Sequence, residues 1–468
     1  MNPDPPDAIR LERLLPEHLL RVPDDDAGTA ITVALSGGLD SSVLLHRLAA
    51  LPTVRARGLR ALHVHHGLHR DADAWAAHCS ATCAALGVPL AVQRVAVARD
   101  SGLGLEGAAR AARHAAFARA LGKDEVLALA HHQDDQAETF LLRALRASGP
   151  DGLAAMRPWR RFAAGWMWRP LLLLPRARLE AWARARKLAW IEDPANADPI
   201  HDRTLLRRTV LPLLRQRWPG ADTALARSAA LCAEAADLLA VHDAAALDGL
   251  MARASDGDGG DALPADDERT GDRTRGHRTL PTGPLEALPP AQRARLLRAW
   301  VAGLGLPPLP ASAIPGIEAL LAARGDGAAA YRWSNACVRA WRGRLHAMPL
   351  QALAPLEPGW ARRWDGRAPL PLPGGGSLAL EGAEAFGQPL HAHARRGGER
   401  IHLPGRTHSH ALKQVLQDAG IAPWQRARMP LLSDAAGRLL AAGDRILDAS
   451  LHAWLQARGA RLRWRDLA

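Results

Sequence analysis

The sequence has little of several residue types that particular protein classes need. Only four cysteines occur in 468 residues, too few for a disulfide scaffold and typical of a reducing compartment. No uncharged apolar run approaches the roughly 18 residues of a membrane-spanning helix. The N-terminal residues are acidic and proline-rich, without the apolar stretch of a secretory signal. We therefore expect a cytoplasmic protein with no membrane partner.

Lysine is also scarce, since Lys123, Lys187 and Lys413 are the only ones among 60 basic residues. The chain is nevertheless strongly basic, with a formal net charge of +12 and a pI near 10.8. Such an excess fits a polyanionic partner such as nucleic acid. A coding-DNA composition that favours arginine codons explains it equally well, so charge alone leaves nucleic-acid binding open.

The N-terminal half alternates apolar, β-branched runs with segments of helical spacing. This alternation predicts parallel βαβ units in a doubly wound, Rossmann-like α/β sheet, whose ligands bind where strands end. We expect strands at 31–35, 59–67, 89–97 and 125–132, and helices at 41–48, 72–87, 106–122 and 135–145. Polar clusters follow the first, second and fourth strands.

Composition also predicts three parts. Residues 1–220 contain the predicted sheet, and residues 221–350 read as mainly helical, with a charged, glycine-rich, flexible insertion at 254–284. Residues 351–468 mix short strands with a helix, as expected of a small α+β domain.

A glycine-rich loop, SGGLDSS, joins the first strand to the next helix. Its glycines allow main-chain N–H groups to approach a phosphate, and the helix N-terminus favours an anion. Asp40 suits a bound Mg²⁺ that bridges to phosphate oxygens. The lysine of a Walker A loop is absent, and a plain turn capped by Asp and Ser is the alternative. The candidate phosphate-binding residues are Ser36, Gly37, Gly38, Leu39, Asp40, Ser41 and Ser42.

A second polar cluster follows the fourth strand. His131 and Asp135 are four residues apart, and Asp135 and Glu138 three apart, so one helical face is expected to present all three. Carboxylates in a basic protein suggest a cation or an ammonium ligand. The alternative is helix capping, with Asp134 as the N-cap residue.

These segments resemble known enzymes. SGGLDSS is similar to the PP-loop of the N-type ATP pyrophosphatases, which split ATP into AMP and pyrophosphate. Residues 63–75, 102–117, 130–156, 190–214 and 397–432 together resemble the tRNA(Ile)-lysidine synthetase family. Two positions depart from the family pattern: His114 stands where tyrosine is common, and Thr204 replaces the usual asparagine.

The resemblance implies a ligase that forms a carbon–nitrogen bond. ATP adenylates the C2 oxygen of the wobble cytidine in the CAU anticodon of tRNA-Ile, the amine of free L-lysine attacks C2, and AMP leaves. It implies ATP and Mg²⁺ as cofactors, tRNA binding by residues 221–350 and 351–468, and a possible homodimer.

The resemblance also implies roles for single residues. Asp40 and Asp135 would bind the metal, and His131, Asp135 and Glu138 would handle the metal or the lysine. Arg113 and Arg203 would approach phosphate or the adenylated base. For Arg113 the alternative is a surface ion pair, and for Arg203 and Arg207 it is contact with the tRNA backbone.

Three other functions stay open from the sequence. A tRNA 2-thiolation enzyme of the same superfamily usually needs a Cys-x-x-Cys pair, which is missing. An amidotransferase-like ligase usually carries a glutaminase domain or an N-terminal catalytic cysteine, and neither is present. A non-catalytic RNA-binding protein would not need the acidic residues at positions 40 and 135.

Overall fold

The computed structural model describes residues 29–98, 100, 104–192, 202–256, 279–322 and 329–465. The chain forms two compact units, residues 1–239 and 240–468, which are described separately below. In the described ranges, no helix is both long and apolar enough to cross a lipid bilayer.

The first unit alternates strands and helices as the sequence predicts. Its strands are β1 (Ile31–Ala34), β2 (Leu59–His65), β3 (Leu90–Arg94), β4 (Val126–Ala128), β5 (Trp159–Phe162) and β6 (Gly165–Trp168). Its first helices are α2 (Leu39–Ala49), α3 (Pro52–Ala56), α4 (Ala72–Leu86), α5 (Gly104–Ala120) and α6 (Gln133–Ala144). Then follow α7 (Pro150–Leu153), α8 (Arg176–Ala185), α9 (Asp202–Leu205), a π-helical turn η2 (Leu206–Val210), α10 (Leu211–Arg217) and the start of α11 (Ala221–Asp256).

The six strands form one sheet in the order β3-β2-β1-β4-β6-β5. All neighbours are parallel except β5, which runs antiparallel to β6. Ile31 of β1 pairs with Leu59 on one side and Val126 on the other. The chain therefore leaves β1 in one direction toward β2 and β3 and later places β4 on its opposite side. The carboxyl ends of β1 and β4 flank this switch point, where doubly wound sheets bind ligands.

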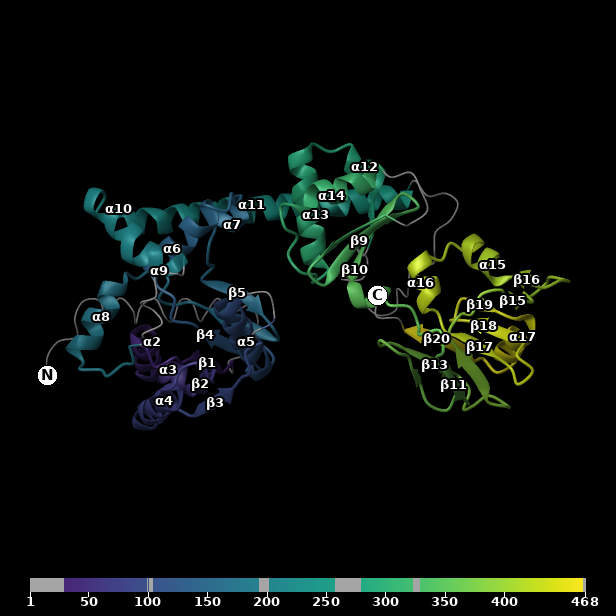
Figure 1. Ribbon diagram of the computed structural model, residues 1–468, viewed down its shortest axis with the longest axis horizontal. Helices are drawn as coiled ribbons and strands as arrows, with labels where there is room; N and C mark the ends of the chain where they lie inside the picture. Colours follow the sequence, from purple (N-terminus) through teal and green to yellow (C-terminus); the bar gives the residue numbers. More distant parts are fainter. Residues whose placement is uncertain are drawn as a thin grey trace. The chain divides into compact units, whose positions relative to one another are not determined.

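Apolar side chains cover both faces of the sheet. One cluster joins β1 to α2, α4 and α8, and includes Ile31, Val33 and Leu44. A second cluster joins Leu62 and Leu127 of the sheet to α5. Figure 1 accordingly shows α2 and α4 on one side of the strands and α5 on the other. The predicted doubly wound α/β fold is confirmed.

Two features of this sheet differ from the prediction. The strand expected at 125–132 ends at Ala128, and the helix expected at 135 begins at Gln133, so His131 lies in the loop between them. The β5–β6 hairpin adds two strands that the sequence did not indicate, because their four-residue runs are rich in Trp and Arg rather than alternating.

The first part of the second unit combines helices with an antiparallel sheet of order β7-β10-β9-β8. Its strands are β7 (Thr279–Pro281), β8 (Ala330–Trp333), β9 (Ala336–Trp341) and β10 (Arg344–Pro349). Its helices are α12 (Thr282–Glu286), α13 (Pro290–Gly303), α14 (Ala313–Leu321) and a 3₁₀ turn, η5 (Leu350–Leu353). The strands add to the helices expected there. They are short, and the β9–β10 hairpin turns at Arg342-Gly343, both with positive φ.

Ordered structure reaches into both ends of the predicted insertion at 254–284. Residues 254–256 end α11, and residues 279–284 lie in β7 and α12. Residues 257–278 lie outside the described residues.

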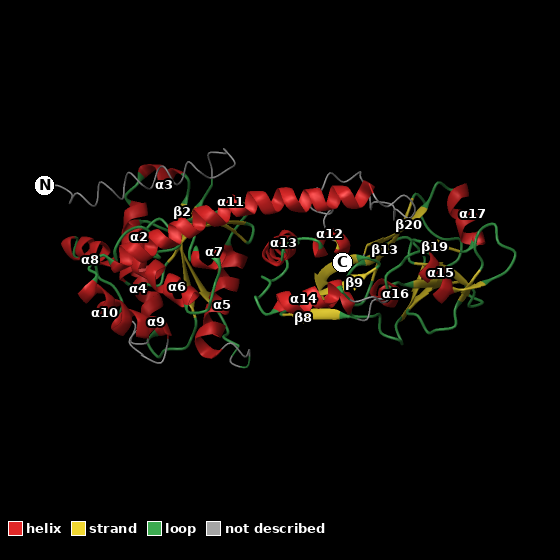
Figure 2. Ribbon diagram, turned by 90° about the horizontal axis from the view of Figure 1, so that it is seen from above, coloured by secondary structure: helices red, strands yellow, loops and turns green. Residues whose placement is uncertain are grey.

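The C-terminal part mixes strands and helices, as predicted. Its strands are β11 (Ala361–Trp364), β12 (Leu370–Pro371), β13 (Ser377–Glu381), β14 (Leu390–His393), β15 (Arg400–Ile401), β16 (His410–Ala411), β17 (Leu431–Ser433), β18 (Leu439–Ala442), β19 (Ile446–Leu447) and β20 (Arg461–Arg465). Its helices are α15 (Leu412–Asp418), α16 (Pro423–Arg428) and α17 (Ala449–Ala457), all red in Figure 2. Five strands form the largest sheet, in the order β11-β14-β17-β18-β19. The predicted boundaries of the three parts stay a prediction.

Candidate functional site

The glycine loop joins β1 to α2 and is held by its own serines. Ser36 N–H donates to Ser41 Oγ at 3.2 Å, and the hydroxyls of Ser41 and Ser42 donate to the carbonyls of Gly38 and Gly37. Ser41 and Ser42 are buried, whereas Ser36 is exposed. Leu39 packs in the core, so only its main chain can face a ligand. The hydroxyls therefore shape the loop and accept hydrogen bonds from the amides of Ser36 and Gly38, while the N-terminus of α2 favours an anion.

A segment far along the chain supports this loop. Ile191 N–H donates to the Gly37 carbonyl at 2.9 Å. Gly37 has φ +86°, and a Cβ built on it would lie 2.5 Å from Ile191 Cδ1 and 3.0 Å from Cys79 Sγ. Only glycine fits this position without strain. Ile191 is a contact that the motif did not reveal.

Asp40 stands in the first turn of α2 and faces a histidine and an arginine. Its carboxylate lies 3.7 Å from His132 Nε2 and 3.7 Å from Arg176 Nε. Burial, the largest influence, raises the pKa of Asp40, and these neighbours offset the rise only in part. Asp40 Oδ1 is buried and accepts no hydrogen bond from the protein. An oxygen of this kind suits a hard cation.

His132 links Asp40 to the second polar cluster. It is the N-cap of α6: its Nδ1 accepts from Asp135 N–H, and its own N–H donates to Asp135 Oδ2 at 3.0 Å. Its Nε2 lies 3.3 Å from Asp135 Oδ2. The imidazole is 2% exposed, so its position is fixed. Asp134 was the expected N-cap under the capping alternative, and that assignment is wrong.

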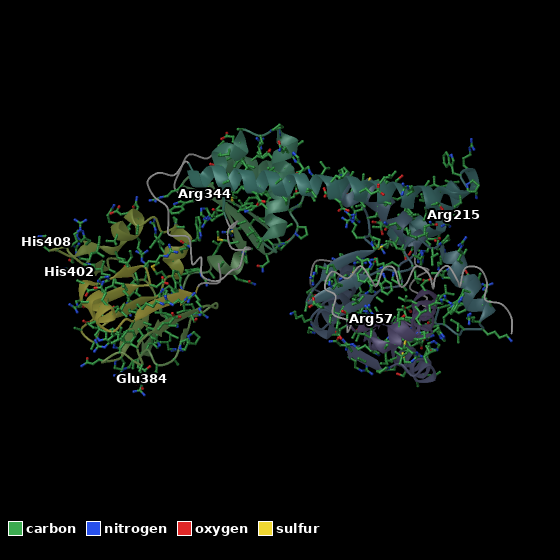
Figure 3. All side chains as sticks on the ribbon, turned by 180° about the vertical axis from the view of Figure 1, so that it is seen from behind. Arg57, Arg215, Arg344, Glu384, His402 and His408 are labelled. Carbon is green, nitrogen blue, oxygen red and sulfur yellow. The ribbon has the colours of Figure 1, made fainter. Side chains whose placement is uncertain are left out.

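Asp134 instead supports the site from outside. Its carboxylate accepts the N–H of Arg176 at 2.9 Å and a hydrogen bond from Arg215 Nη2 at 3.0 Å. Arg215 also pairs with Asp222, and Figure 3 marks its place on α10. These bonds join the starts of α6 and α8 to α10.

Asp135 and Glu138 share one guanidinium. Arg207 Nε donates to Glu138 Oε1 at 2.7 Å, and its Nη2 donates to Asp135 Oδ1 at 3.1 Å. Glu138 is fully buried, and burial raises its pKa despite this pairing. Burial would also raise the pKa of Asp135, but His132, His131 and Arg207 lower it further than burial raises it. Asp135 therefore stays ionised at neutral pH.

His131 does not share a helical face with these carboxylates. It precedes α6, and its Nδ1 accepts a hydrogen bond from Arg169 Nε at 3.2 Å. Burial lowers the pKa of His131, and the nearby Arg169 and Arg203 lower it further. A neutral imidazole that accepts from a guanidinium is suited to positioning. The expectation of one shared face failed because the helix starts two residues later than His131.

The two predicted arginines lie near the cluster on other elements. Arg203, on α9, places Nη2 3.5 Å from Thr139 Oγ1 of α6. Arg113, on α5, is exposed and has no ion pair among the described residues. A surface ion pair, the alternative for Arg113, is therefore not observed. Thr204 is buried next to Arg203.

The acidic groups fit a phosphate-assisted cation site better than a closed metal site. No three His, Cys, Asp or Glu residues of the described ranges are arranged to hold a metal alone. Asp40 and Asp135, joined through His132, supply two carboxylates. Mg²⁺ is typically held by one or two carboxylates with substrate phosphates and water. Cys79 and Cys83 are buried core residues, so they offer no exposed thiol for sulfur chemistry.

We predict that Gly37→Ala impairs binding of ATP, the nucleotide that the loop resemblance implies. A left-handed φ costs a residue with a Cβ about 1–2 kcal/mol, and the new methyl group would displace Ile191. The dissociation constant for ATP, measured by calorimetry, should rise at least about tenfold. Gly87→Ala is the control: φ there is +63°, with no atom within 4 Å of the added Cβ. Equal ATP affinities in the two variants would contradict the prediction.

We predict that Arg207→Gln destabilises the protein in a pH-dependent way. The variant leaves the buried Glu138 carboxylate unpaired, at a cost of about 2 kcal/mol, or about 4–8 °C in Tm. Because burial already raises the pKa of Glu138, the folded state binds a proton more readily than the unfolded state. The deficit should therefore shrink as the pH falls toward the folded-state pKa.

The control for Arg207→Gln is Arg227→Gln, which removes an exposed ion pair to Glu234 that contributes little to stability. Thermal melts between pH 4.5 and 8 measure both. A pH-independent deficit, or equal Tm values for both variants, would refute the Glu138 pairing as a stabilising contact.

The chain is similar to known proteins along most of its length. Three family models match: a PP-loop domain over residues 9–214, a TilS substrate binding domain over 280–346 and a TilS substrate C-terminal domain over 390–464. The tRNA(Ile)-lysidine synthase of Xanthomonas campestris is 53% identical over 94% of this chain and 95% of its own. That of Xylella fastidiosa is 53% identical over 95% of this chain and 96% of its own.

A solved structure, the crystal structure of a TilS C-terminal domain, is 24% identical. The match covers 23% of this chain and 99% of the chain in that structure, with a TM-score of 0.19. The full-length relatives and the three domain matches, together with the PP-loop and its acidic neighbours, show that the chain belongs to the tRNA(Ile)-lysidine synthase family.

Proposed function

We propose that the protein uses ATP to adenylate the C2 oxygen of the wobble cytidine in the CAU anticodon of tRNA-Ile, and then joins L-lysine to that carbon. As a member of its family it is a tRNA-modifying, ATP-using ligase that forms a carbon–nitrogen bond. The observation that carries the finer proposal is the link between Asp40 and Asp135 through His132, at the switch point of the sheet.

The glycine loop supplies the first step. Main-chain amides at the start of α2 bind the β- and γ-phosphates, and the exposed Ser36 hydroxyl reaches the same group. The C2 oxygen attacks the α-phosphorus of ATP. The bond between the α-phosphorus and the oxygen that bridges to the β-phosphate then breaks, and pyrophosphate leaves. Fixed donors stabilise the charge that develops on the phosphate oxygens.

Asp40 and Asp135 would hold Mg²⁺, which would supply charge neutralisation on the phosphates. The unbonded Asp40 Oδ1 supports this assignment. His132 keeps the two carboxylates near each other, and Arg176 approaches Asp40 from α8. Asp40 is the residue on which adenylation depends most.

The pair of Asp135 and Glu138 suits the amino acid. Lysine reaches the site as a cation, and a carboxylate that stays ionised at neutral pH can attract it. The amine must also lose a proton before it attacks C2, and a carboxylate of this cluster would accept that proton. Attack forms the new C–N bond, and the bond from C2 to the AMP oxygen breaks. Glu138 is fully buried against Arg207, which makes it a positioning residue.

The second unit would bind the rest of the tRNA. Two of the matched family models, over 280–346 and 390–464, are described as TilS substrate domains, which supports this assignment. A cytoplasmic location follows from the proposed tRNA substrate, and a homodimer stays a prediction.

Labelled lysine tests the proposal directly. Incubated with ATP, Mg²⁺ and total bacterial tRNA, the protein should transfer [¹⁴C]lysine to RNA, and nucleoside analysis should identify a lysine-modified cytidine. Asp40→Asn should abolish this transfer and tRNA-dependent AMP formation while leaving tRNA affinity unchanged. Asp71→Asn, an exposed carboxylate, is the control. Transfer of lysine to protein only, or normal turnover by Asp40→Asn, would contradict the proposal.

Replacing Asp135 should affect lysine more than ATP. Asparagine keeps an acceptor for the His132 N–H but removes the charge that attracts the amine. In steady-state assays at saturating Mg²⁺, where Asp40 still supplies one carboxylate to the metal, we expect Asp135→Asn to raise KM for lysine about tenfold or more and KM for ATP by less. Asp134→Asn is the matched control, since Asp134 bonds to Arg176 and Arg215; it should lower Tm without changing KM for lysine. Equal effects on both KM values would remove Asp135 from lysine binding.

A further inference from the structure

Five arginines gather beside the site, and the proposed reaction steps above give a role to none of them. We call Arg110, Arg113, Arg143, Arg160 and Arg203 the arginine patch. They come from α5, α6, β5 and α9, all in the first unit. Arg203 is half-buried, and the other four are exposed.

Strand β5 brings the patch to the edge of the sheet that carries the site. It runs antiparallel to β6, and Arg160 pairs with Met167 near the carboxyl end of β6. The next parallel strand is β4, which ends just before His131. Arg160 therefore lies at the same edge as the loop that leads to the acidic cluster.

Helix α5 packs against this hairpin. The imidazole of His114 lies 5.8 Å from the ring of Phe162, and the Arg160 guanidinium lies 5.6 Å from the same ring. Arg110 is one helical turn before His114, so it projects beside Arg160.

Helices α6 and α9 complete the patch. Arg203 of α9 approaches Thr139 of α6, and Arg143 lies one turn beyond Thr139. Partial desolvation by the surrounding side chains lowers the pKa of Arg110, and the nearby charges of Arg203, Arg160 and Arg143 lower it further. The pKa of Arg113 is lowered in the same way, by partial desolvation and by the charges of Arg110 and Arg203.

The patch carries unbalanced charge. Among the described residues, none of its five members forms an ion pair, although Arg157, Arg161 and Arg215 in the same unit each do. Glu106, one turn before Arg110, opposes the lowering of the pKa of Arg110 but does not cancel it.

Arg169 adds a buried positive charge behind the patch. It is 7% exposed, and its hydrogen bonds go to neutral groups, His131 and the Arg157 carbonyl. Burial, with Arg160 and Arg110, lowers its pKa to about 10, so it stays charged at neutral pH. Like charges held together without carboxylates are stabilised by a bound anion.

We propose that the arginine patch binds phosphodiester groups of the nucleotides that flank the modified cytidine in the anticodon loop. This inference rests on the proposed function for the identity of the RNA. Five guanidinium groups on four elements are spread too widely for one small anion. The triphosphate of ATP already has a separate candidate binding site, the glycine loop after β1. A single strand that crosses the patch would bring several phosphates to it and leave one base free to enter beside Asp135.

A charge-matched pair of triple variants tests this. The first carries Arg110→Gln, Arg143→Gln and Arg160→Gln. The control carries Arg57→Gln, Arg119→Gln and Lys123→Gln, which remove the same charge at the opposite edge of the sheet, before β2 and β4; Figure 3 labels Arg57. Binding of unmodified tRNA-Ile is measured at several salt concentrations, with ATP binding measured in parallel.

The patch variant should bind the tRNA more weakly than the wild-type protein. The slope of its plot of log K against log salt should be less steep by about 2, because three contacts are lost and each single-strand contact contributes about 0.7 to the slope. The control variant should keep the wild-type slope, and both should bind ATP normally. A wild-type slope in the patch variant, or an equal loss in both variants, would overturn the inference. If the wild-type protein bound this RNA through the patch but formed no modified cytidine, the proposed function would fail and the patch would stand.

Discussion

The capping box at the start of α6 is the interaction on which the rest of the site depends. His132 caps the helix through Asp135 and at the same time turns its other ring nitrogen toward Asp40. One buried imidazole thereby sets the distance between the first turn of α2 and the first turn of α6. Because β1 and β4 are neighbours in the parallel sheet, this contact bridges the switch point where a ligand would bind.

Charge is distributed unevenly around that contact. The acidic groups are paired on one side, by Arg207 to Asp135 and Glu138 and by Arg215 to Asp134. On the other side, toward α5 and β5, the five members of the arginine patch lack carboxylate partners in the described part of the chain. A cation and a triphosphate suit the first region, and an RNA backbone suits the second. Under the proposed function, the same edge of one sheet would offer complementary surfaces to ATP and to the RNA.

The sequence predicted the fold and the glycine loop because both depend on local patterns. Alternating strands and helices, and a strand–glycine–helix junction, are readable from neighbouring residues. His132 was missed because its role depends on where α6 begins, and helix starts shift by one or two residues with the capping partner. The placing of His131 on the helical face failed for the same reason.

Other parts of the site could not be read because they join distant segments. Arg207 meets Glu138 across 69 positions, and Ile191 reaches Gly37 from beyond α8. No spacing rule connects such pairs. Thr204, which departs from the family pattern, lies buried beside Arg203, a placement that the sequence pattern did not indicate.

The most direct test of this account is a crystal structure with a non-hydrolysable ATP analogue and Mn²⁺ in place of Mg²⁺. The account predicts the phosphate chain on the amides of residues 36–42 and an anomalous peak between Asp40 and Asp135. A nucleotide bound elsewhere, or a metal peak away from both carboxylates, would contradict it.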